Sequence, residues 1–190
     1  MSKILLPSVL TLLVFSVLTG LIYPFVVTGI ASVCCARQAQ GSLIRQGDQL
    51  VGSALLGQPF DDPKYFWPRP SATTPQPYNG ASSAGSNLGP TNPAQIDAVK
   101  AQLAALQQAD PDNKLPVPVD LVTASGSGLD PQISPAGAEY QLTRVARARG
   151  IDPQKVRSLV AAHTQSRQWA VLGEPRVNVL ELNLALDALH

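Results

Sequence analysis

The second half of the sequence contains side chains of the types needed for nucleophilic catalysis. Ser125 or Ser127 would be the nucleophile, and His163 would be its general base. Asp120 or Asp130 would orient the imidazole, and the glycines beside the serines would offer N–H groups to an oxyanion. However, neither serine lies in a Gly-x-Ser-x-Gly elbow, and helical spacing places His163 on a core-facing side. A serine hydrolase is therefore an alternative hypothesis and not the leading one.

The segment Ser-Gly-Ser-Gly-Leu-Asp-Pro, at residues 125–131, has two interpretations. As a turn, it uses glycine for positive φ angles and Asp-Pro to end the preceding element. As an anion nest, its successive N–H groups would bind a phosphate. No lysine lies in the segment, and the chain has neither a P-loop nor a Gly-x-Gly-x-x-Gly motif that opens a helix. The residues favour the turn.

The composition argues against several kinds of site. The chain has two histidines, and its two cysteines, Cys34 and Cys35, are adjacent to an apolar segment. We therefore expect neither a metal site nor a disulfide scaffold. The 14 basic and 13 acidic side chains nearly cancel. Nucleic-acid binding requires clustered Lys and Arg, so we expect no nucleic-acid partner.

Residues 4–33 form one uncharged, apolar run. About 20 such residues are enough to cross a bilayer, whereas the apolar region of a cleaved signal peptide has about 7–15. A signal peptide and a lipoprotein signal ending at Cys34 are the alternatives, but the length favours a retained transmembrane anchor. Pro24, deep in the run, should kink or end the regular helix.

The charges beside this run do not decide its orientation. Lys3 and the α-amino group lie on one side, and Arg37 and Arg45 lie on the other. A tail of two or three residues is easily left in the cytoplasm. We therefore expect a single-pass protein of the plasma (inner) membrane with a cytoplasmic N-terminus and an extracytoplasmic C-terminal domain.

Residues 34–56 are predicted to be a connector followed by a first strand at 49–56, and residues 57–190 form the remainder of the domain. Within it, residues 57–93 are rich in Pro, Gly and Ser, which alone would suggest disorder. Yet most of the aromatic residues outside the apolar run lie there: Phe60, Tyr65, Phe66, Trp67 and Tyr78. Disordered segments are poor in aromatic residues, so we expect an ordered, functional loop.

The rest of the chain has strong helix signals. Caps followed by proline predict helices that begin after Asn92, Ser134 and Asp152. The second should end at Gly150, where nearby arginines suit the negative helix end. A capping box at Asn178 predicts a last helix, although alternating leucines keep a strand open there. Residues 115–124 are predicted to be an edge or irregular strand. The predicted fold is α+β: a single N-terminal transmembrane helix, then one soluble α+β domain.

Several blocks together resemble one known family. They are Tyr-Phe-Trp-Pro-Arg-Pro-Ser-Ala-Thr at 65–73, Pro-Tyr-Asn at 77–79, Ser-Asn-Leu-Gly-Pro-Thr-Asn-Pro at 86–93, Val-Pro-Val-Asp-Leu-Val-Thr-Ala-Ser-Gly-Ser-Gly-Leu-Asp-Pro at 117–131 and Leu-Gly-Glu-Pro-Arg-Val-Asn-Val-Leu at 172–180. With the N-terminal anchor, they resemble the C subunit (KdpC) of the Kdp potassium-transporting P-type ATPase. One departure is Gln132, where the family commonly has His.

The resemblance implies a non-catalytic accessory subunit of an ATP-driven potassium uptake complex. Such a subunit assists assembly and raises the ATP affinity of the hydrolytic P-type ATPase subunit, as a catalytic chaperone. Its partners would be that subunit, a potassium-channel-like subunit and membrane lipid, and potassium would be the substrate of the complex. A free-standing, membrane-anchored extracytoplasmic binding or serine-hydrolase domain is the alternative.

The resemblance also implies an ATP-associated loop, which consists of Ser125, Gly126, Ser127, Gly128, Leu129, Asp130 and Gln132. ATP is cytoplasmic, so a domain outside the membrane would influence the hydrolytic subunit through conformational coupling. Interfaces favour aromatic residues and arginine. We therefore expect the partner-facing residues to be Tyr65, Phe66, Trp67, Arg69, Tyr78, Asn79 and Asn87. For Phe66 and Trp67, burial in the core is an equally good interpretation.

Overall fold

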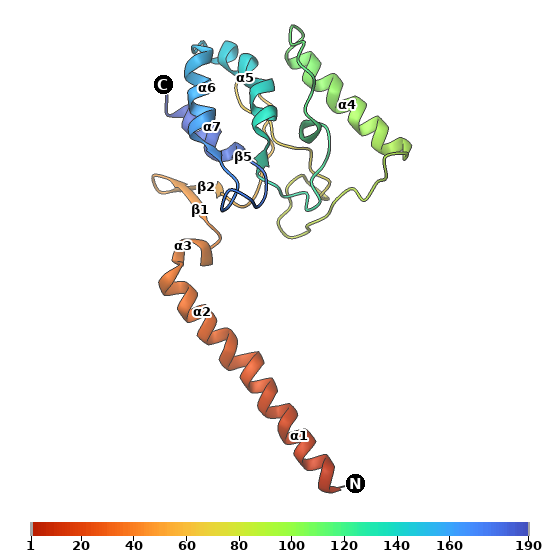
Figure 1. The fold of residues 1–190 in the computed structure, drawn as a ribbon, viewed down its shortest axis with the longest axis vertical. Helices are drawn as coiled ribbons and strands as arrows, with labels where there is room; N and C mark the ends of the chain where they lie inside the picture. Colours follow the sequence, from red (N-terminus) through yellow and green to blue (C-terminus); the bar gives the residue numbers. More distant parts are fainter. Residues whose placement is uncertain (1, 190) are drawn as a thin grey trace. The chain divides into compact units, whose positions relative to one another are not determined.

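The computed structural model describes residues 2–189, in two units, Met1–Leu43 and Ile44–His190 (Figure 1). The first unit is almost entirely helical: α1 (Ser2–Val17), a π-helical turn (Leu18–Ile22), α2 (Tyr23–Cys34) and the short α3 (Ala36–Ala39). The run Lys3–Cys34 has 32 residues and is long and apolar enough to cross a membrane. At 1.5 Å per residue it measures about 48 Å, more than the hydrocarbon core requires.

Pro24 interrupts the regular helix, as expected, but does not end it. Proline has no N–H, and its ring collides with the carbonyl group four residues earlier. The π-helical turn Leu18–Ile22 immediately precedes α2, which carries Pro24 in its first turn. A π-helical turn is a common way to absorb such an interruption.

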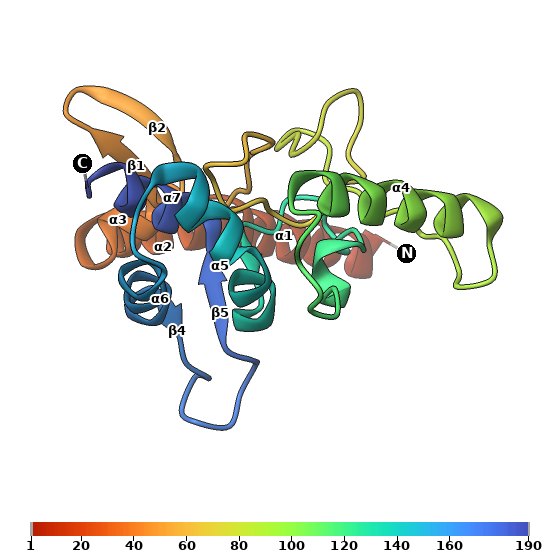
Figure 2. The same ribbon diagram turned by 90° about the horizontal axis from the view of Figure 1, so that it is seen from above.

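The second unit contains the remaining elements. Its helices are α4 (Pro93–Ala109), α5 (Pro135–Arg149), α6 (Pro153–Ala162) and α7 (Val179–Asp187). In Figures 1 and 2, α5, α6 and α7 gather around β5, and α4 lies apart from α6 and α7. The side chains of Asn92, Ser134, Asp152 and Asn178 accept hydrogen bonds from the N–H groups of the first turns. These caps confirm the predicted helix starts and show that the alternating leucines belong to a helix.

Two small sheets complete this unit. β1 (Leu43–Gln46) pairs with β2 (Gln49–Ser53). A three-stranded antiparallel sheet has the order β3 (Gln132–Ile133), β5 (Arg176–Asn178), β4 (Thr164–Gln165). The chain is thus α+β, as predicted. The prediction of a strand at 115–124 was wrong, because this segment is irregular apart from a 3₁₀ turn, Val119–Leu121. Pro116 and Pro118 have no N–H for a sheet ladder, which explains the difference.

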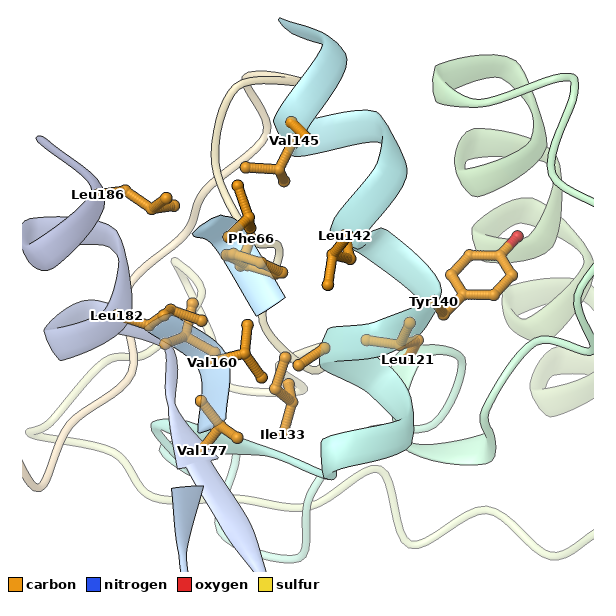
Figure 3. Close-up of a cluster of buried hydrophobic side chains, with 14 of the residues drawn as sticks. Phe66, Leu121, Ile133, Tyr140, Leu142, Val145, Val160, Val177, Leu182 and Leu186 are labelled. Atoms are coloured by element: carbon orange, nitrogen blue, oxygen red, sulfur yellow. The ribbon is translucent and has the colours of Figure 1, made fainter. Parts of the chain in front are cut away.

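The core lies between α5 and α7, with the three-stranded sheet at one end (Figure 3). Phe66 comes from the long irregular segment and is 0% exposed. Figure 3 shows its ring between Leu182 and Leu186 on one side and Leu142 and Val145 on the other. The irregular segment, residues 54–92, therefore contributes directly to the core and is ordered by it.

Candidate functional site

The side chain of Asn183, in α7, forms hydrogen bonds with both the N–H and the carbonyl oxygen of Phe66. The Phe66 N–H donates to Asn183 Oδ1 at 2.9 Å, and Asn183 Nδ2 donates to the Phe66 carbonyl oxygen at 3.0 Å. Asn183 is 1% exposed. Buried backbone groups need partners, and this one amide supplies both, as a neighbouring strand would.

Gln141 of α5 does the same for the next residue. The Trp67 N–H donates to Gln141 Oε1 at 2.7 Å, and Gln141 Nε2 donates to the Trp67 carbonyl oxygen at 3.0 Å. Gln141 is also 1% exposed. Residues 66 and 67 are therefore held from two helices by amide groups, an arrangement we call the amide clamp (Asn183 and Gln141). It fixes the backbone of residues 66 and 67, beside the predicted partner-facing residues Tyr65 and Arg69.

Arg144 reinforces this arrangement from within the protein. Its guanidinium donates to the Pro63 carbonyl oxygen at 2.6 Å and to Gln141 Oε1 at 2.7 Å, and its Cζ lies 4.6 Å from the Trp67 ring centroid. Burial lowers the pKa of Arg144 to about 10, which leaves it charged at neutral pH. Arg144 is one of the arginines near Gly150 that we interpreted as solvated helix-end cations. For Arg144 this was wrong, because the residue is only 3% exposed and its guanidinium donates to the loop.

A second group of contacts shapes the loop around Arg69. Its guanidinium forms an ion pair with Asp130, with Nη1 3.1 Å from Oδ2. The Tyr78 hydroxyl donates to the Arg69 carbonyl oxygen. Ser71 Oγ accepts the Tyr78 N–H at 2.9 Å and donates to the Gly128 carbonyl oxygen at 2.7 Å. Arg69, Tyr78 and Asp130 are thus joined into one cluster.

The other residues predicted to face a partner differ in how far they are buried. Phe66 is buried in the core, so it has no surface to offer a partner, and the core interpretation holds for it. Trp67 is half-buried against the same core. The Tyr65 hydroxyl donates to Asp187 Oδ2, at the end of α7. Asn79 donates to the Thr74 carbonyl oxygen, and Asn87 is exposed at a φ angle of 52°.

The loop 125–128 is packed beneath residues 83–85. The Gly128 N–H donates to Ser125 Oγ at 2.9 Å, and the Leu129 N–H donates to Ser127 Oγ at 3.1 Å. The Ser127 carbonyl oxygen accepts the Ala84 N–H at 3.0 Å. Gly128 has a φ of +68°, and a Cβ there would lie 2.5 Å from the Ala84 carbonyl oxygen. Both serine hydroxyls of the loop, its Gly128 N–H and its Ser127 carbonyl oxygen are therefore used in holding the fold.

An open cavity of about 440 Å³ adjoins this loop, lined in part by Ser125, Ser127, Arg69 and Asp130. Asp130 neutralises the only cation among the lining residues, because its carboxylate pairs with Arg69. A phosphate placed there would meet a carboxylate, which disfavours an anion site. Gln132 lies outside this lining, in β3, where it pairs with Asn178.

The structure does not assemble the hydrolase residues. Asp120 accepts the Ser134 N–H at 2.6 Å as part of the start of α5, and Asp130 is paired with Arg69. His163 Nδ1 lies 3.0 Å from the Leu159 carbonyl oxygen of its own helix. In residues 2–189 no hydrogen bond joins His163 to Ser125 or Ser127, and no group of three or more His, Cys, Asp or Glu side chains is placed to hold a metal ion.

The stability of the second unit should fall at alkaline pH because of Tyr78. Burial, and next the Asp130 carboxylate, raise the pKa of the Tyr78 phenol above its ordinary value of 10.0. Above pH 10 the unfolded chain then loses a proton that the folded chain keeps, so the free energy of unfolding decreases as pH rises. We expect a shallower decrease in Tyr78→Phe than in the wild type, measured by urea unfolding of the full chain in detergent. Equal slopes would contradict this assignment.

The comparisons with known proteins identify the family of this chain. The sequence model of the family described as K+-transporting ATPase, c chain (KdpC) matches residues 5–188. The chain belongs to the KdpC family. The resemblance seen in the sequence blocks is therefore confirmed.

Individual KdpC relatives match over nearly their whole length. The potassium-transporting ATPase KdpC subunit of Sorangium cellulosum (strain So ce56) is 64% identical over 181 residues, covering 95% of each chain. The KdpC subunit of Dechloromonas aromatica (strain RCB) is 58% identical over 189 residues, covering 100% of this chain and 99% of that one. The KdpC subunit of Variovorax paradoxus (strain S110) is 61% identical over 188 residues, covering 99% and 97%.

Proposed function

We propose that this KdpC chain is the non-catalytic accessory subunit of an ATP-driven potassium uptake complex. In this role it assists assembly and raises the ATP affinity of a separate hydrolytic subunit. Its relatives are named subunits of a potassium-transporting ATPase and align over nearly the full chain, which supports the proposal. The apolar helix Lys3–Cys34 would anchor it in the inner membrane, with a cytoplasmic N-terminus and the second unit outside.

The observation that carries the finer part of this proposal is the hydrogen bonding of the loop 125–128. Its serine hydroxyls accept the N–H groups of Gly128 and of the following Leu129, and its Ser127 carbonyl oxygen accepts the Ala84 N–H. These are the bonds of a structural turn that supports the partner-facing loop. An effect on ATP affinity would then reach the hydrolytic subunit as a coupling free energy through subunit contacts, with no direct ATP contact here.

The surface that would transmit this coupling is built around Arg69 and Tyr78. The amide clamp fixes the backbone just before Arg69, and the Asp130 ion pair sets the direction of its guanidinium. A preorganised arginine and tyrosine are well suited to an interface, because little conformational entropy is lost on docking. We place the contacts with the hydrolytic and potassium-channel-like subunits here, together with Asn79 and Asn87.

Two substitutions separate the coupling role from direct nucleotide binding. We expect Arg69→Ala to raise the KM for ATP of the assembled complex, because it removes a contact residue. Ser127→Ala should leave that KM unchanged, because the exposed hydroxyl serves only the Leu129 N–H. A photoreactive ATP analogue should label the hydrolytic subunit and not this chain. Labelling of this chain, together with a raised KM in Ser127→Ala, would show that the loop binds ATP directly.

A further inference from the structure

The connection between β4 and β5, residues 166–175, projects from the second unit (Figure 2). It carries exposed apolar side chains. Trp169 is 86% exposed, Val171 is 70% exposed and Leu172 is 49% exposed. Trp169 is one of two tryptophans in the chain. Burying such side chains is favourable, so their joint exposure on one projection indicates a surface that another apolar phase covers. We call residues 166–175 the tryptophan hairpin.

The tryptophan hairpin is held in one conformation. The N–H groups of Gln168 and Leu172 each donate to the carbonyl oxygen of the other residue at 2.9 Å, and the Val171 N–H donates to the Gln168 carbonyl oxygen at 3.2 Å. Trp169 and Ala170 both have positive φ angles, 51° and 63°. L-residues adopt this conformation at a cost in energy, so the bonds of the hairpin maintain an unfavourable backbone that presents Trp169 outward.

The tip can enter an apolar phase without carrying a free charge into it. Arg167 and Glu174 lie at the base of the hairpin, and Arg167 Nη2 is 2.6 Å from Glu174 Oε2. The cross-hairpin bonds satisfy the N–H groups of Gln168, Val171 and Leu172, which matters where no water is available. A tryptophan with two aliphatic neighbours and no unpaired cation is typical of the zone between lipid headgroups and acyl chains.

Chain connectivity keeps the second unit near the bilayer. The apolar helix ends at Cys34 and the second unit begins at Ile44, so the connection spans at most about 35 Å. Within the second unit, Figure 1 draws the β1–β2 hairpin and the dark-blue connection before β5 both at the lower end, and Figure 2 shows that they project on opposite sides. Leu50 of β2 and Leu55 just after it are 54% and 59% exposed. The edge at which the chain enters the unit thus carries further exposed apolar side chains.

We infer that the tryptophan hairpin inserts its tip, Trp169, Val171 and Leu172, into the interfacial zone of the bilayer that anchors the chain. It would be a second membrane contact, separate from the transmembrane helix, and would limit rotation of the second unit about its connector. The inference rests on the anchor assigned under the proposed function and does not depend on potassium transport.

Tryptophan fluorescence tests this inference in the full chain alone, reconstituted into phosphatidylcholine vesicles. Trp67→Phe leaves Trp169 as the single emitter, and Trp169→Phe leaves Trp67 as a matched control. We expect blue-shifted emission from Trp169 and strong quenching by lipids brominated near the headgroup, with weaker quenching by deeper bromines. Trp67 is half-buried beneath the Arg144 guanidinium and should be quenched little.

The outcomes separate the hairpin from the anchor. Resistance of the chain to alkaline extraction reports the transmembrane helix. If the chain resists extraction but Trp169 has water-like emission without quenching, the inference is overturned, and the hairpin then faces water or a protein partner. If Trp67→Phe fails to fold, the Trp169 signal is obtained by subtracting the emission of Trp169→Phe from that of the wild type. A lack of brominated-lipid quenching in this difference would also overturn the inference.

Discussion

Replacing Phe66 by alanine should lower the free energy of unfolding by about 3–5 kcal/mol. The ring is 0% exposed and lies between Leu182 and Leu186 of α7 and the apolar face of α5. Its removal loses buried apolar surface and leaves a cavity between two helices that the sheet and the amide clamp hold apart. Urea unfolding of the full chain in detergent, followed by tryptophan fluorescence, measures the change.

Phe60→Ala is the matched control for this substitution. Phe60 belongs to the same loop and is only half-buried, with its ring centroid 5.3 Å from that of Tyr65. Because less of its surface leaves water on folding, the loss should be clearly smaller. If the two substitutions destabilise the chain equally, Phe66 is not the central core contact of the irregular segment.

Replacing Asn183 by leucine should cost about 2–5 kcal/mol, although the new side chain is apolar and of similar size. The N–H and carbonyl groups of Phe66 would remain buried without their present partners, and each unsatisfied group carries its desolvation penalty. The same unfolding measurement applies. In the assembled complex we also expect a raised KM for ATP, since the clamp positions the loop that carries Arg69.

Gln154→Leu is the corresponding control. Gln154 is exposed on α6, where its side chain accepts only from the Arg157 guanidinium at 3.2 Å. Its replacement should change the free energy of unfolding by no more than about 0.5 kcal/mol. A loss in Asn183→Leu as small as in this control would show that the amide clamp does not order residues 66 and 67.

Local signals in the sequence predicted the helices well. Asn92-Pro93, Ser134-Pro135 and Asp152-Pro153 begin helices because a cap and its proline act on neighbouring N–H groups, independently of the rest of the fold. Strands depend instead on a distant partner. Residues 115–124 have apolar residues suitable for a strand but are irregular, whereas β1 was not expected at all. Apolar pattern alone does not identify the backbone with which a segment pairs.

The sequence predicted which segment contributes to the candidate site, but not which residues hold that segment in place. Aromatic content indicated that residues 57–93 are ordered. The residues that order them are Gln141, Arg144 and Asn183, and each of their hydrogen bonds to Trp67, Pro63 and Phe66 joins positions at least 74 apart in the sequence. A signal was present: Gln141 and Asn183 are polar residues within the apolar faces of their helices, next to Leu142 and Leu182. A buried amide needs partners, so such positions predict bonds to a distant backbone.

The side of the membrane on which the second unit lies tests the central claim most directly. Ser82 is exposed within the irregular segment, so Ser82→Cys, with Cys34 and Cys35 replaced by alanine, offers one thiol to a membrane-impermeant maleimide. In intact cells containing the assembled complex, we predict that this thiol is labelled from outside. ATP then cannot reach the loop 125–128, and the effect on the hydrolytic subunit must pass through subunit contacts. Labelling only after the cells are permeabilised would contradict this account and would place the loop on the side where ATP is present.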